Sequence, residues 1–125
     1  MSIIGIGNDI VEIGRIRNAL GKHGEAFVRR LLTPGEIALA GSKYDPVIFY
    51  AGRWAAKEAC AKALRCGIGE KCSFTDITVL NNENGAPEIT LTGNALNSFQ
   101  QLGGSNIFLS ISHEKDYAVA TVVIG

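Results

Sequence analysis

The residues best suited to chemistry lie near the middle of the chain, where Glu58 is followed by Lys62 and Arg65. Successive residues of an α-helix are rotated by about 100°, so these three side chains would share one narrow stripe. One carboxylate beside two cations suits a site for a phosphate group and a metal ion. The same Glu-to-Lys spacing also forms an ordinary surface ion pair worth only about 0.3–0.5 kcal/mol, so the stripe alone leaves both interpretations open.

A second carboxylate, Asp9, follows the short apolar stretch at residues 2–6. A carboxylate at the edge of a buried strand would lose solvation unless it gained a partner. That partner could be a helix N-terminus, Arg15 or a metal ion shared with Glu58. Protein sites hold Mg²⁺ with one or two carboxylates plus phosphate oxygens and water. We therefore hypothesise that Asp9 and Glu58 bind Mg²⁺ while the two cations of the stripe hold phosphate oxygens.

His113 follows a predicted strand that contains Ser110 and Ser112. A histidine at the end of a strand is either an ordinary polar or capping residue or a ligand contact. The surrounding sequence has neither the order of a Ser-His-Asp triad nor a nucleophile elbow, which disfavours a hydrolase.

A long helix over residues 46–64 would present the stripe. Asp45 followed by Pro46 predicts its start, and the glycines of residues 66–69 predict its end. The side opposite the stripe consists of small residues that allow a neighbouring backbone to approach closely: Ala55, Ala56, Ala59, Cys60 and Ala63.

The remaining elements alternate between short helices and strands. The predicted strands cover residues 2–6, 74–80, 87–92, 106–112 and 117–124, and the predicted shorter helices cover 12–20, 25–32, 34–41 and 94–102. Gly21 and Gly24 are predicted to separate the first two helices. Thr33 and Glu36 predict a capping box, to which we assign a structural role only.

Hairpins dominate this order of elements, with a turn predicted at residues 81–85. The sequence therefore predicts an α+β fold, in which a largely antiparallel sheet packs against one long and several short helices. Because residues 117–124 are nearly all apolar, that strand should be central and covered on both faces. The length of 125 residues predicts a single domain over residues 1–125.

The composition is that of an ordinary globular protein, with 12 basic and 12 acidic residues and 46% hydrophobic residues. No stretch approaches the ~20 apolar residues that would cross a membrane. The first residues do not resemble a secretory signal. Cys60, Cys66 and Cys72 form an odd set whose spacing fits no usual zinc site, so we expect small buried residues in a reducing compartment. These features predict a cytoplasmic protein.

Residues 13–32 carry a net charge of +4, because the segment contains five basic residues and one acidic residue, Glu25. The basic residues are Arg15, Arg17, Lys22, Arg29 and Arg30. This segment is either a solvated helix face or a surface for an acidic partner. An RNA-binding domain is a weaker alternative, because aromatic residues make up only 7% of the chain and no strand shows an aromatic platform.

Three segments, taken together, resemble the bacterial holo-acyl-carrier-protein synthases, which are small phosphopantetheinyl transferases. The segments are GIGNDIVE at residues 5–12, GRWAAKEACAKA at 52–63, and SISH at 110–113 with YAVA at 117–120. The likeness extends from end to end. Asn8 and Trp54 depart from it, since other members often carry apolar or phenylalanine residues there.

The resemblance implies the 4′-phosphopantetheinyl transferase fold and an enzyme that moves 4′-phosphopantetheine from coenzyme A to a serine of apo-acyl carrier protein. Adenosine 3′,5′-bisphosphate would be released. By the same resemblance, Asp9 and Glu58 bind Mg²⁺, Lys62 and His113 contact coenzyme A, and Arg53 contacts its 3′-phosphate. The family also implies a homotrimer with active sites between subunits.

The sequence leaves the general base open among water on the metal, Glu58 and His113. Acyl carrier proteins are acidic, so Arg15, Arg17 and Lys22 are predicted to bind this partner. Neither nucleic acid nor membrane is expected as a partner. The alternative function is a non-catalytic module that binds coenzyme A or a nucleotide and regulates a partner.

Overall fold

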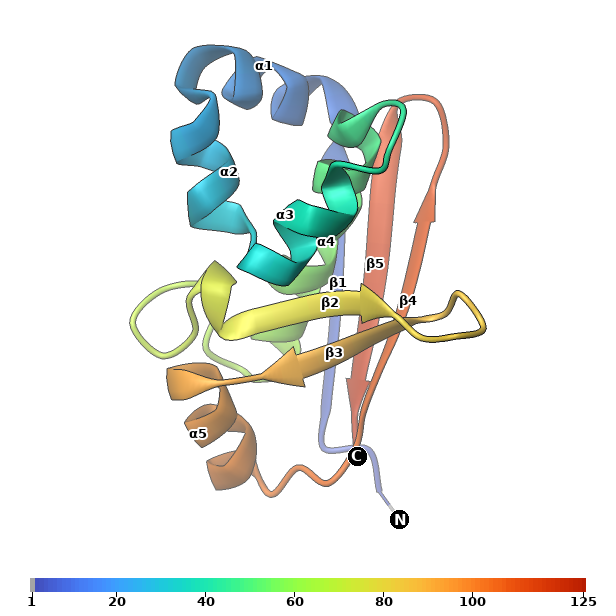
Figure 1. The fold of residues 1–125 in the computed structure, drawn as a ribbon. Helices are drawn as coiled ribbons and strands as arrows, with labels where there is room; N and C mark the ends of the chain where they lie inside the picture. The colour runs from blue at the N-terminus through green and yellow to red at the C-terminus, as the bar shows by residue number, and fades with distance from the viewer. Residues whose placement is uncertain (1) are drawn as a thin grey trace.

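The longest helix, α4, lies against one face of a three-stranded antiparallel sheet (Figure 1). The computed structural model describes residues 2–125. In chain order, its elements are β1 (Gly5–Glu12), α1 (Ile13–His23), α2 (Glu25–Leu31), α3 (Pro34–Ala40), α4 (Pro46–Ala63), the 3₁₀ turn η1 (Phe74–Asp76), β2 (Ile77–Asn81), β3 (Pro87–Leu91), α5 (Gly93–Leu102), β4 (Ile107–His113) and β5 (Tyr117–Ile124).

The main sheet has the order β1-β5-β4, so β5 is the central strand. Both neighbours pair with β5 in the antiparallel sense, and Ala120 lies between Asp9 on one side and Ile111 on the other. The hairpin of β2 and β3 forms a separate two-stranded sheet that runs across the longer strands (Figure 1). The predicted α+β class with largely antiparallel pairing is confirmed.

Strand β1 and helix α4 approach each other closely because small residues line both. Ala55, Ala59 and Ala63 of α4 are fully buried. A Cβ atom on Gly7 would collide with the carbonyl oxygen of Ala59, and one on Gly5 would collide with that of Ala63. The absence of side chains at these glycines therefore sets the distance between β1 and α4.

The predicted helix starts are confirmed. The Asp45 carboxylate accepts a hydrogen bond from the Val47 N–H (3.1 Å) at the start of α4, and Pro46 occupies the first turn. At the start of α3, Thr33 and Glu36 form the capping box, in which the Thr33 N–H donates to Glu36 Oε1 (2.8 Å).

The first strand differs from its prediction. Instead of ending at residue 6, β1 covers Gly5–Glu12 and includes Asp9 in its interior. The polar residues were interpreted as the strand's end, but β1 is an edge strand, where polar side chains find partners or solvent. The amide of Asn8 donates to the Ala120 carbonyl (3.2 Å) and to Thr121 Oγ1 (2.9 Å).

Two further boundaries were predicted wrongly. Helix α1 continues through Gly21 and ends at His23, just before Gly24, whose φ of 51° favours glycine. Residues 74–76 form a 3₁₀ turn rather than the beginning of a strand, because the Asp76 carboxylate accepts a hydrogen bond from the Ser73 N–H (3.2 Å).

Strand β5 is central, as predicted, but in the single chain only one of its faces is covered. Ala118, Ala120, Val122 and Ile124 are buried on the side facing α4. The opposite side, here called the outer sheet face, includes Ile6, Asn8, Ile10, Phe108, Ser110, Ser112, Val119, Thr121 and Val123. Ile6, Ile10 and Phe108 are 66%, 64% and 59% exposed, so this face is an apolar surface open to a partner.

The cysteines behave as small buried residues. Cys60 and Cys72 are buried, Cys66 is half-buried, and all three are free thiols. Burial raises the pKa of the Cys60 thiol and raises that of Cys72 to about 12. Within residues 2–125, no helix combines the length and apolar character needed to span a membrane.

Candidate active site

Strand β1 and helix α4 bring Asp9, Glu58 and Lys62 together at one edge of the main sheet; these three residues are here called the carboxylate cluster. Lys62 Nζ donates to Asp9 Oδ1 (3.1 Å) and to the Asn8 carbonyl (3.0 Å). The Lys62 side chain is half-exposed, whereas that of Asp9 is mostly buried. Glu58 precedes Lys62 by one helical turn on the same side of α4.

The two carboxylates of the cluster lie close enough for their charges to interact. Burial raises the pKa of Glu58, and the negative charge of Asp9 raises it further, while Lys62 acts in the opposite direction. Bringing a cation between the carboxylates would relieve this repulsion.

The donor set fits Mg²⁺ bound together with a substrate. Among residues 2–125, no group of three or more His, Cys, Asp or Glu side chains is placed to hold a metal ion. Mg²⁺ does not require such a group, because two carboxylates suffice when phosphate oxygens and water complete its coordination.

Arg53 and His113 lie elsewhere, on a cleft of about 440 Å³, here called the basic cleft. Its lining residues are Lys43, Tyr44, Asp45, Ile48, Phe49, Gly52, Arg53, Ile111 and His113. The volume falls in the range of small-molecule sites, which is about 300–1,000 Å³. Three basic side chains, beside one carboxylate (Asp45) that is paired with Arg17, favour an anionic ligand.

The Arg53 guanidinium is held rigidly in the wall of the basic cleft. It donates to the Val79 carbonyl (3.3 and 3.2 Å) and to Asn81 Oδ1 (3.4 Å). Its Cζ lies 4.2 Å from the centre of the Phe49 ring. Burial lowers the pKa of Arg53, and the nearby carboxylate of Glu36 opposes this effect.

The sequence-predicted residues therefore form two groups on opposite edges of the sheet. Asp9 belongs to the edge strand β1, His113 belongs to the other edge strand β4, and β5 separates them. With a strand spacing of about 4.8 Å, the two edges are about 10 Å apart. Within one chain, His113 is thus placed at the basic cleft rather than beside Glu58.

Arg65 joins neither group. Its guanidinium donates to the carbonyl of Ile4 (2.8 Å), the residue just before β1. Asp9 lies five residues further along the chain, inside β1. Among residues 2–125, Arg65 is also the only residue other than glycine that has a positive φ (66°). The structure therefore does not support the hypothesis that Arg65 holds phosphate oxygens beside Asp9.

The predicted partner-binding residues Arg15, Arg17 and Lys22 lie on α1, where each is exposed. Arg17 forms an ion pair with Asp45 (3.3 Å). Within residues 2–125, no ion pair involves Arg15 or Lys22, so their charges are available to a partner.

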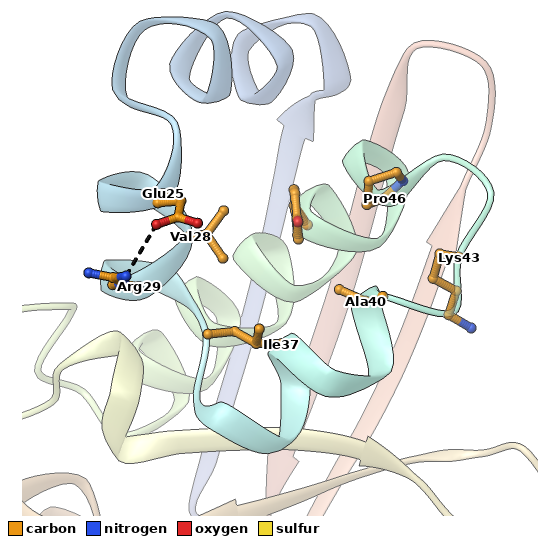
Figure 2. Close-up of a pocket in the computed structure, with 9 residues that line it drawn as sticks. Glu25, Val28, Arg29, Ile37, Ala40, Lys43 and Pro46 are labelled. Atoms are coloured by element: carbon orange, nitrogen blue, oxygen red, sulfur yellow. Dashed lines mark hydrogen bonds and ion pairs between the residues drawn. The ribbon is translucent and has the colours of Figure 1, made fainter.

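Another hollow, of about 500 Å³, lies among α2, α3 and α4 (Figure 2). Its wall carries the ion pair between Arg29 and Glu25 (3.2 Å), in which Arg29 is locally neutralised. The hollow contains neither the carboxylate cluster nor Arg53 or His113, so it is not part of the candidate site.

Sequence reasoning missed the role of Lys57 and underestimated that of Glu36. Both side chains are 0% exposed and pair with each other (2.6 Å). A usable signal was present, because Lys57 stands among the small residues that form the buried side of the helix. A lysine in such surroundings needs a buried partner.

Comparisons with known proteins identify the family. The family model of the 4′-phosphopantetheinyl transferase superfamily matches residues 5–122. A holo-[acyl-carrier-protein] synthase from Shewanella frigidimarina is 49% identical over 124 residues, covering 99% of this chain and 98% of the relative. A second, from Aliivibrio fischeri, is 46% identical and covers 98% of each chain.

Solved structures agree with these relatives. The holo-[acyl-carrier-protein] synthase of Neisseria meningitidis superposes with a TM-score of 0.93 at 39% identity, covering 99% of both chains. The Helicobacter pylori synthase, solved in complex with coenzyme A, gives a TM-score of 0.83 at 38% identity, covering 96% of this chain and 99% of the other. The chain therefore belongs to the holo-[acyl-carrier-protein] synthases of the 4′-phosphopantetheinyl transferase superfamily.

Proposed function

We propose that this protein transfers 4′-phosphopantetheine from coenzyme A to a serine of apo-acyl carrier protein and releases adenosine 3′,5′-bisphosphate. The relatives are synthases of this kind, and one of the similar structures holds coenzyme A. The observation that carries the proposal is the carboxylate cluster, in which Asp9 and Glu58 lie together with a half-exposed lysine.

The overall activity has a direct test. The protein is incubated with apo-acyl carrier protein, coenzyme A and Mg²⁺, and the mass of the carrier is measured. We expect an increase by one phosphopantetheine group. A non-catalytic module that binds coenzyme A would leave the carrier's mass unchanged.

In the transfer step, the serine oxygen forms a bond to the β-phosphorus of the coenzyme A diphosphate. The bond from that phosphorus to the bridging oxygen breaks, and the bridging oxygen leaves with its electron pair on adenosine 3′,5′-bisphosphate. The serine proton passes to a general base. Mg²⁺ held by Asp9 and Glu58 would neutralise and orient the diphosphate oxygens.

Lys62 supplies a mobile positive charge for this step. In the structure its ammonium neutralises Asp9, and its side chain is half-exposed. With Asp9 engaged as a metal ligand, Lys62 would be free to donate to the departing phosphate oxygen, where negative charge develops. The general base stays open among water on the metal, Glu58 and His113.

His113 is assigned to binding coenzyme A, together with Arg53. We expect His113→Ala to raise the KM for coenzyme A about tenfold, the effect of losing one hydrogen bond to a phosphate. The kcat of the variant should keep the wild-type pH dependence between pH 6 and 8. Loss of that dependence would instead identify His113 as the general base.

The active protein is proposed to be a homotrimer that pairs the carboxylate cluster of one copy with the basic cleft of the next. Two observations support this arrangement. The two groups lie on opposite edges of the sheet within one chain, and the apolar outer sheet face is open to another copy.

Mixing two impaired variants, at a coenzyme A concentration well below the KM of the cleft variant, tests the shared site. One is Glu58→Gln, and the other carries Lys43→Glu with His113→Ala in the basic cleft. In trimers that are assembled at random from equal amounts, about one interface in four combines two intact halves. We expect about a quarter of the wild-type activity, whereas sites contained within single chains would give only the residual activities of the two variants.

The acidic acyl carrier protein is proposed to dock on α1 through Arg15, Arg17 and Lys22. We expect Arg15 to contribute most, because it is unpaired and closest in sequence to Asp9. Arg15→Glu should raise the KM for the carrier about tenfold at low salt, and less at high salt. Lys71→Glu, an equal charge change in the loop before η1, is the control. An unchanged KM for Arg15→Glu would contradict this docking.

A further inference from the structure

A fully buried ion pair involves Lys57, the residue that precedes Glu58 in α4. The Lys57 ammonium and the Glu36 carboxylate are both 0% exposed, and Nζ lies 2.6 Å from Oε1. Lys57 Nζ also donates to the carbonyl oxygens of Leu31 (2.6 Å) and Phe74 (3.0 Å). These three bonds use every proton of the ammonium group, so Lys57 is held in one position.

Glu36 is held equally firmly from the other side. Its Oε1 accepts from the Thr33 N–H (2.8 Å), and its Oε2 accepts from the Val79 N–H (2.7 Å). The carbonyl of Val79 in turn accepts from Arg53 in the basic cleft. One residue of β2, Val79, is thus held by Glu36 at its N–H and by Arg53 at its carbonyl oxygen.

The pair connects both parts of the candidate site through helix α4. Lys57 is the residue before Glu58, and Arg53 lies one turn earlier on the same helix. Fixing Lys57 against α2, η1 and Glu36 fixes the rotation of α4 about its axis. That rotation sets the direction in which Glu58 points toward Asp9.

Stability alone does not account for such a pair. Breaking a buried ion pair by removing one partner is strongly destabilising, but replacing both partners by neutral groups of similar volume is often neutral or stabilising. A neutral replacement would not reproduce the directional hydrogen bonds that the pair makes to α2, η1 and β2. Functional groups need to be held to within about 0.5 Å and 10–20°.

We infer that Lys57 and Glu36 are positioning residues. They hold α4 at the rotation about its axis that lets Glu58 and Asp9 share one Mg²⁺. Through Val79 they also link this rotation to the position of Arg53. The inference rests on the proposed function. Neither residue touches substrate or metal, and both act through the orientation of Glu58.

The test compares metal affinity with stability in the double variant Glu36→Gln with Lys57→Met, which removes both charges at nearly constant volume. Binding of Mn²⁺, as a probe for Mg²⁺, is measured by calorimetry with coenzyme A present and acyl carrier protein absent, and stability is measured by urea unfolding. Glu36→Asp is the second, milder variant, because it keeps the ion pair but shortens the carboxylate side chain by one methylene.

We expect the folded variants to bind Mn²⁺ about 10- to 100-fold more weakly, the usual effect of losing outer support for metal ligands. The KM for acyl carrier protein should stay within about twofold, because the docking surface on α1 is untouched. If the double variant does not fold, the same comparison is made with Glu36→Asp. Wild-type Mn²⁺ affinity in a folded variant would overturn the inference.

The failure of the proposed metal site would look different. In that case the wild-type protein would not bind Mn²⁺, or Asp9→Asn would bind it as well as the wild type does. Either result overturns the metal site itself and, with it, the inference. Loss of Mn²⁺ binding in Asp9→Asn together with unchanged binding in the double variant would overturn only the positioning role.

Discussion

Replacing Glu58 by Gln is expected to reduce phosphopantetheine transfer by a factor of about 10³, because the reaction then lacks one of the two carboxylates that we propose as metal ligands. The amide keeps the shape of the side chain but not its charge. Transfer to apo-acyl carrier protein would be measured by mass spectrometry over a range of Mg²⁺ concentrations.

The fold of this variant should be intact. In the metal-free protein the pKa of Glu58 is raised above its ordinary value of 4.5 by burial and by Asp9. The folded state therefore binds the proton more tightly than the unfolded state. Stability from this group is fully present below the ordinary pKa and is lost as the pH rises through the raised one. At neutral pH, Glu58→Gln avoids that loss, so its free energy of unfolding should equal or exceed that of the wild type.

The matched control is Glu88→Gln, which removes an exposed carboxylate of β3 far along the chain from the cluster. It should retain wild-type transfer and wild-type dependence on Mg²⁺. Near-normal, Mg²⁺-dependent activity in Glu58→Gln would contradict the assignment of Glu58 as a metal ligand.

Gly7→Ala is expected to have the largest effect on stability. A Cβ atom at this position would overlap the Ala59 carbonyl oxygen, and both β1 and α4 would have to move. Neither can give way easily, because Ala55, Ala59 and Ala63 are completely buried. Overpacking of this kind costs about 3 kcal/mol, which would lower the Tm by roughly 10 °C.

Gly14→Ala provides the comparison for this substitution. Gly14 lies in the first turn of α1, and nothing lies within 4 Å of a Cβ atom added there. The change should stabilise the protein by about 0.5–1 kcal/mol, because alanine loses less backbone entropy in a helix. Equal Tm values for Gly7→Ala and the wild type would show that the distance between β1 and α4 is not fixed by this glycine.

Local signals in the sequence were sufficient to predict the helix that carries Glu58 and Lys62. Asp45 and Pro46 begin it by short-range hydrogen bonding and fixed backbone geometry, and both effects depend only on neighbouring residues. The capping box of Thr33 and Glu36 is local for the same reason. The motif resemblance added the family, which the comparisons confirm.

Features that depend on packing between distant segments were not predictable in the same way. The polar side chains of Asn8 and Asp9 were interpreted as the end of a strand, but pairing with β5 continues the strand to Glu12. The partner of Lys57 is 21 residues away in the chain, and it also serves as a local cap. Local reasoning found the cap at Glu36 but not the ion pair.

The division of the site into two groups follows from the order of the strands. The apolar composition of residues 117–124 predicted that β5 is central, but not that its two neighbours are β1 and β4. That order places Asp9 and His113 on opposite edges. The proposed homotrimer would bring such a pair together from two copies of the chain.

The shared metal site is tested most directly by crystals of the protein grown with Mn²⁺ and coenzyme A, in which anomalous scattering locates the metal. We expect one Mn²⁺ whose first coordination sphere contains carboxylate oxygens of both Asp9 and Glu58. Diphosphate oxygens should complete that sphere. A metal bound to coenzyme A but outside the reach of both carboxylates would contradict the proposed mechanism.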